Sequence, residues 1–137
     1  MTRTTTAALL ACIALAGCNS KPQQSTEKEP NIRIVGDEQK QLHQLDAFNL
    51  AIGLKRAIYD AGYTCKKITD AGFVGTWENL DEWTARCVYE NGSTRDWAIF
   101  AGPDGSAQVR DCKDVVASGL PACAIKQRPK GSFIFKK

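Results

Sequence analysis

The six cysteines of this 137-residue chain constrain its fold more than any other feature. Two of them lie near the start, at Cys12 and Cys18, and the other four are Cys65, Cys87, Cys112 and Cys123. No two have the Cys-x-x-Cys spacing of a zinc ligand set or of a thioredoxin-like redox motif, and the chain has one histidine. We therefore expect no metal site and no cofactor.

Residues 1–17 have the parts of a secretion signal. Arg3 supplies a positive charge, and residues 7–16 form an apolar run of ten residues. A membrane-spanning helix needs about 20 such residues. We therefore interpret residues 1–17 as a signal peptide, which takes Cys12 with it and has no part in the fold.

The signal ends in Leu15-Ala16-Gly17-Cys18, an aliphatic residue followed by two small residues and a cysteine. This pattern resembles the lipobox of bacterial lipoproteins. The resemblance implies that Cys18 becomes the first mature residue and carries a diacylglyceryl group on its thiol, with a further acyl chain such as palmitate on its amino group. Two or more acyl chains anchor a protein stably. The resemblance thus implies a protein of the cell envelope, and Asn19 favours the outer membrane over the inner one.

Residues 19–31 contain no large apolar residue, so we expect residues 18–31 to be a lipidated cysteine and a flexible tether. The remaining residues 32–137 suffice for one small domain. Its last stretch, residues 124–137, is basic and has no acidic residue. This basic tail lacks the interleaved aromatic residues of a nucleic-acid groove. We expect contact with the membrane through the acyl chains, an envelope protein as a further partner, and no nucleic acid.

Four cysteines remain in the mature chain. An even number in an exported chain indicates disulfides, and four cysteines allow three connectivities. We favour Cys65–Cys87 and Cys112–Cys123, because each pair closes a local unit.

Apolar residues at helical spacing from Leu42 to Tyr59 predict one long helix over residues 38–61, begun by Asp37 and ended by Gly62. Gly53 lies inside it, and a tight contact with the sheet would explain that glycine. After Gly62 the pattern favours strands. We expect strand segments at 63–67, 73–77, 83–89, 94–101 and 106–110, and turns at 79–82, 90–93 and 102–105. We also expect a short helix at 112–118 and a last strand at 132–135.

This order of elements predicts an α+β domain in which the long helix packs on a small antiparallel meander of about four strands. It is similar in element order to the PepSY-like and β-lactamase-inhibitor-protein-like folds. A likeness at this level implies nothing about function.

Three tryptophans, Trp77, Trp83 and Trp97, fall within 21 residues of one another. They can form an exposed aromatic patch that binds a partner or the aromatic part of a core. We favour the core and keep the binding patch as the alternative.

No catalytic motif is present. His43 falls on the polar flank of the expected helix, without a nucleophile at a recognisable spacing. The acidic pair Asp81-Glu82 is expected in a turn. We therefore expect a non-enzymatic binding module. The alternatives are an enzyme inhibitor that inserts residues 102–105 or the Asn91-Gly92 hairpin into a cleft and, less favoured, a small hydrolase with a pair of carboxylates.

Overall fold

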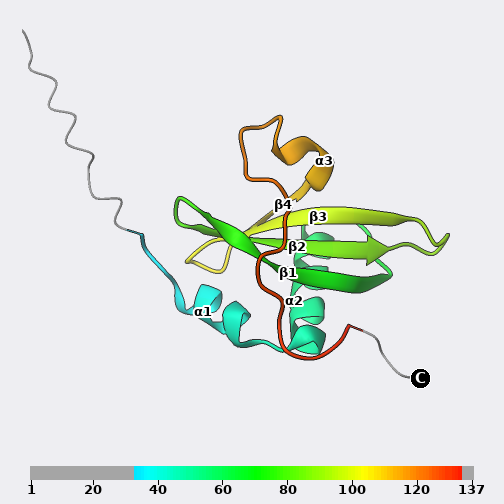
Figure 1. Cartoon of the computed structure of the whole chain (residues 1–137), viewed down its shortest axis with the longest axis horizontal. Helices are drawn as coiled ribbons and strands as arrows, with labels where there is room; N and C mark the ends of the chain where they lie inside the picture. The colour runs from blue at the N-terminus through cyan, green and yellow to red at the C-terminus, as the bar shows by residue number, and fades with distance from the viewer. Residues whose placement is uncertain (1–32, 134–137) are drawn as a thin grey trace, which may run out of the picture. The chain divides into compact units, whose positions relative to one another are not determined.

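The computed structural model of the chain describes residues 33–133. Its elements in chain order are α1 (Asp37–Gln44), α2 (Ala47–Asp60), β1 (Lys67–Trp77), β2 (Leu80–Val88), β3 (Thr94–Ala101), β4 (Ala107–Asp111) and α3 (Cys112–Val115). The strands form one antiparallel sheet in the order β1-β2-β3-β4. The α+β class and the four-stranded meander are confirmed (Figure 1).

The expected signal peptide, Cys18, the tether, Lys136 and Lys137 lie outside the described residues. Within residues 33–133 no helix has the length and apolar character needed to cross a membrane.

The prediction of one long helix over residues 38–61 is wrong, because the helical region is divided into α1 and α2. Leu45 ends α1 with an extended backbone (ψ 142°), and the Asp46 carboxylate then accepts a hydrogen bond from the Asn49 N–H as the N-cap of α2. An aspartate at this position starts a new helix, because its side chain satisfies an amide that has no partner within the helix. The two helices therefore meet at a corner at residues 45–46.

Helix α2 covers one face of the sheet with its apolar side. Leu50, Leu54 and Ile58 are at most 1% exposed and pack with Trp83 and Trp97 from the strands. The helix ends before Gly62, whose positive φ of 85° is the conformation expected for this glycine. The expected tight contact at Gly53 is absent among the described residues, since a Cβ there would meet only Leu42 Cδ2 at 4.0 Å.

The turn between β1 and β2 is shorter than expected. It consists of Glu78 and Asn79, and β2 already begins at Leu80. The predicted turn at 79–82 is therefore wrong. Asp81 and Glu82 are consecutive strand residues that point to opposite faces of the sheet, and both are fully buried.

Both disulfides join the expected partners. Cys65, just before β1, is bonded to Cys87 in β2, and Cys112 at the start of α3 is bonded to Cys123. Disulfide bonds persist in oxidising environments, so they indicate an extracytoplasmic compartment for this domain.

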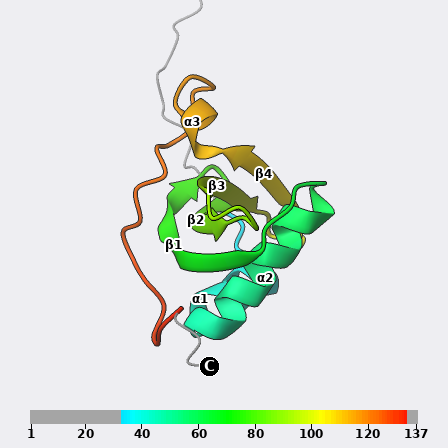
Figure 2. The same cartoon turned by 90° about the vertical axis from the view of Figure 1, so that its right-hand side faces the viewer.

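Residues 123–133 form an extended segment that we call the C-terminal strap. It starts at α3 on the face of the sheet opposite α2, passes the edge of β1 and reaches the N-terminal end of α2 (Figures 1 and 2). The Phe73 N–H donates to the Gln127 carbonyl at 2.8 Å, and the Ala47 N–H donates to the Lys130 carbonyl at 2.8 Å. Phe133 is then buried in the core under α2. A last strand is expected at 132–135, but residues 132 and 133 are not in a strand. Residues 134–135 lie outside the described range.

The strap lies so close to β1 that one position of the strand must be glycine. A Cβ on Gly72 would lie 2.4 Å from Ile125 Cγ2 and 2.6 Å from the Gln127 carbonyl oxygen. A Cβ on Gly75, in the same strand, would meet only the flexible Lys126 ammonium at 3.5 Å.

We predict that Gly72→Ala displaces the strap and lowers the free energy of unfolding by about 1–3 kcal/mol, as overpacking does in a well-packed interior. Gly75→Ala is the matched control and leaves the strap in place. Urea denaturation measures the stability, and amide hydrogen exchange at Phe73 and Gln127 reports on the strap. Equal behaviour of the two variants would show that the strap is not tightly packed on β1.

Candidate functional site

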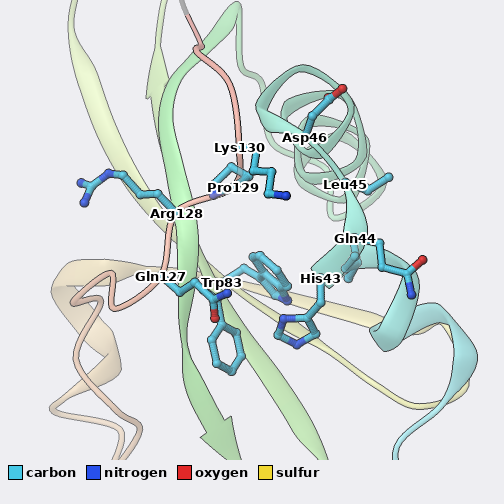
Figure 3. A pocket seen from close by; sticks show the side chains of 11 residues that line it. His43, Gln44, Leu45, Asp46, Trp83, Gln127, Arg128, Pro129 and Lys130 are labelled. Atoms are coloured by element: carbon cyan, nitrogen blue, oxygen red, sulfur yellow. The ribbon is translucent and has the colours of Figure 1, made fainter.

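A pocket of about 410 Å³ lies where the corner between α1 and α2 faces the strap. We call it the hinge pocket. Its walls come from the helix corner, from β1 and β2, and from the strap: Leu42, His43, Gln44, Leu45, Asp46, Phe73, Trp83, Gln127, Arg128, Pro129 and Lys130 (Figure 3). Segments from both ends of the domain therefore meet at this pocket.

The buried Asp81 carboxylate fixes His43 at the bottom of the pocket. Asp81 Oδ2 lies 2.9 Å from His43 Nε2, and Asp81 Oδ1 accepts a hydrogen bond from the Arg33 guanidinium. The Asp81 side chain is 0% exposed, whereas the side chains of Arg33 and His43 are 33% and 34% exposed. A buried carboxylate is costly without partners, and here each oxygen has its own. His43 is exposed, as predicted, but its ring is not free, because one ring nitrogen is bonded to Asp81.

Helix α1 is held in place by a second buried polar residue. Gln39 is 0% exposed, and its amide nitrogen donates to the carbonyls of Asn79 at 2.8 Å and Ala101 at 2.9 Å. Gln39 and His43 are four residues apart and so lie on the same face of α1. The contacts of Gln39 thus position His43 over the sheet.

Three rings form the floor of the pocket. The His43 ring lies edge-on to Phe73, with centroids 4.6 Å apart, and 4.9 Å from Trp83. Phe73 and Trp83 face each other across the β1–β2 ladder, with their ring centroids 5.4 Å apart. The imidazole is therefore restrained by packing as well as by Asp81.

The charged residues around the opening point in different directions (Figure 3). Lys130 extends from the strap across the opening, while Arg128 points away and makes a two-fold ion pair with Asp70 at 2.9 and 3.1 Å. Asp46 also points away, and its carboxylate is used to cap α2. The Lys130 ammonium makes no hydrogen bond or ion pair with any residue in the range 33–133.

This arrangement suits binding better than covalent chemistry. Because the Asp81 carboxylate only accepts hydrogen bonds, His43 Nε2 carries the proton between them, and Nδ1 is left for a ligand. None of the described residues that line the hinge pocket is a serine, threonine or cysteine, the side chains that a histidine commonly activates as nucleophiles. Within residues 33–133 no cluster of three or more histidine, cysteine, aspartate or glutamate side chains could hold a metal ion.

The three tryptophans do not form an exposed patch. Trp83 and Trp97 are only 3% and 2% exposed in the core, and Trp77 lies half-buried at the end of β1. The favoured alternative, a core role, holds for Trp83 and Trp97. Trp83 also lines the hinge pocket, so its place in the core does not exclude contact with a ligand.

The two candidate inhibitory loops differ in their surroundings. Residues 102–105 pack against the start of α1, where Gly36 lies against Pro103 and Gly105 lies against Glu38. The Asn91-Gly92 turn is exposed at the tip of the β2–β3 hairpin. Only this hairpin is free to enter a cleft.

Glu82 is an unusual acid on the other face of the sheet. It is 0% exposed, and neither of its carboxylate oxygens has a hydrogen-bond partner among the described residues. Burial raises the pKa of Glu82 to about 7, and the charge of Lys126 on the strap counteracts this only in part. Because Asp81 faces the opposite side, the two acids do not form the facing pair that a carboxylate-dependent hydrolase needs.

No protein-family model, no curated protein and no solved structure matches this chain.

We predict that Glu82 makes the protein less stable as the pH rises. Its pKa is about 7 in the folded state and near 4.5 when unfolded, so ionisation costs stability between these values and the loss persists above pH 7. Glu82→Gln should equal the wild type near pH 4 and exceed it at pH 8 by up to about 3 kcal/mol. Urea denaturation at several pH values tests this.

Glu90→Gln, at the exposed hairpin, is the matched control and should change stability by less than about 1 kcal/mol at either pH. Parallel pH profiles for the wild type and Glu82→Gln would contradict the assignment.

Proposed function

We propose that this protein is a lipid-anchored lipoprotein of the cell envelope whose domain is a non-enzymatic binding module, with the hinge pocket as its ligand site. The lipobox at residues 15–18 supports the anchor. The two disulfides support an oxidising compartment. Asn19 supports the outer membrane.

The observation that carries the proposal is the hinge pocket itself. Its volume of about 410 Å³ lies within the range of small-molecule sites, which combine apolar walls with a few oriented polar groups. Here apolar residues form the floor, and His43 is held in one orientation by Asp81. A rigid polar group above an apolar floor loses little entropy when a ligand binds, which favours recognition.

The two alternatives have weaker support. An inhibitor would have to use the Asn91-Gly92 hairpin alone, because residues 102–105 are packed on α1. A carboxylate-dependent hydrolase would need two acids in one cleft, and Asp81 and Glu82 lie on opposite faces of the sheet.

We predict that the full chain retains a small molecule from an envelope extract and that filling the hinge pocket prevents this. Gln127→Trp adds an indole at the pocket wall and keeps the backbone hydrogen bonds between residue 127 and Phe73. Mass spectrometry of the desalted protein should show ligand retention reduced by about tenfold or more, which is about 1.4 kcal/mol. Gln108→Trp, at an exposed position of β4, is the matched control. If both variants retain the same molecules as the wild type, the hinge pocket is not the site.

We also predict that Cys18→Ser abolishes incorporation of labelled fatty acid and weakens membrane attachment, because the thioether cannot form without the thiol and the acyl chains supply the anchor. Membrane fractionation and fatty-acid labelling measure this. Cys12→Ser, in the signal peptide, is the control and should leave both unchanged. Continued labelling of the Cys18→Ser protein would contradict the lipid anchor.

A further inference from the structure

We infer that the hinge pocket selects a small ligand that carries an oxyanion, a carboxylate or a phosphate, on an apolar ring-shaped body. This inference rests on the proposed function and adds the chemical class of the ligand. It follows from which charges point into the pocket and from what forms its floor.

The charges that reach into the pocket favour an anion. Lys130 projects across the opening, and His43 faces it from the other side (Figure 3). The Lys130 ammonium has no ion-pair partner among the described residues. A ligand oxyanion at the opening would give this ammonium a charge-assisted hydrogen bond.

The acids of the neighbourhood do not compete for that position. Asp46 points away from the cavity, and one of its oxygens accepts hydrogen bonds from Asn49 N at 2.8 Å and Nδ2 at 3.1 Å. Asp81 lies behind His43, fully buried and paired with Arg33. Asp70 is paired with Arg128. The ammonium of Lys130 is therefore the charge at the opening that has no counter-ion within residues 33–133.

The floor defines the rest of the ligand. Phe73, Trp83 and the His43 ring surround the bottom, and Leu42 and Leu45 add aliphatic walls. An apolar ring fits such a surface because rings stack edge-to-face or offset at centroid distances of about 4.5–7 Å. A bare inorganic anion would leave this surface uncovered.

The experiment is isothermal titration calorimetry on the full chain in mild detergent, with four probes: benzoate, phenyl phosphate, neutral benzyl alcohol and inorganic phosphate. We expect one of the two aryl anions to bind at least about tenfold more tightly than benzyl alcohol and than inorganic phosphate. Which aryl anion binds better distinguishes a carboxylate ligand from a phosphate ligand. Binding should weaken as salt is added.

Lys130→Gln should reduce the affinity for the preferred aryl anion by about tenfold and leave that for benzyl alcohol unchanged. Lys126→Gln is the matched control, because Lys126 is in the same strap and its ammonium lies above Gly75, away from the hinge pocket. Both substitutions are at exposed side chains, and thermal melting verifies that both variants fold.

Equal affinity for benzoate, phenyl phosphate and benzyl alcohol would overturn the anion preference, as would equal behaviour of Lys130→Gln and Lys126→Gln. If no probe binds but the protein retains an extract molecule that Gln127→Trp excludes, the ligand class is wrong and the proposed function stands. If neither probes nor extract molecules occupy the pocket, both are wrong.

Discussion

The arrangement of the site depends on the buried carboxylate of Asp81. It lies at the start of β2 without access to solvent, so its charge must be matched from within the protein. Arg33 and His43 reach it from the chain segments before and within α1. These two contacts and the hydrogen bonds of Gln39 attach a helix with few apolar residues to the end of the sheet. Without these contacts few interactions would hold α1 against the sheet, and the hinge pocket would lose one wall.

The C-terminal strap supplies the opposite wall and also protects the sheet. β1 is an edge strand, and exposed edges are prone to pair with other chains. The strap pairs with this edge at Phe73 and then supplies a carbonyl to the first turn of α2 at Ala47. One extended segment thus covers an edge strand, satisfies a helix N-terminus and completes a pocket. In exchange, the strap lies so close to β1 at Gly72 that no side chain fits at this position.

The sequence was informative where local chemistry decides the structure. The Asn-Gly turn and the alternation around Trp83 predict the central hairpin, and local loop closure predicts both disulfide pairs. It was misleading where a distant partner decides. Asp81 and Glu82 look like turn residues, because nothing local reveals that β2 begins at Leu80 and that both side chains will be buried. Likewise the apolar pattern predicts a continuous helix with His43 on its polar flank. The capping chemistry of Asp46 instead breaks the helix at Leu45. The one available signal was the spacing of Gln39 and His43, two polar residues on the same face of α1.

The burial of Phe133 has a consequence for how the domain forms. This residue, the last one described, fills part of the core under α2, and the strap contacts that lead to it join positions far apart in the sequence. Contacts of this kind slow folding, because the connecting chain must be ordered before they form. A ribosome that has made only the helices and the sheet has produced a domain with an open edge strand and an unfilled core. The native state therefore becomes accessible only after the strap has been synthesised.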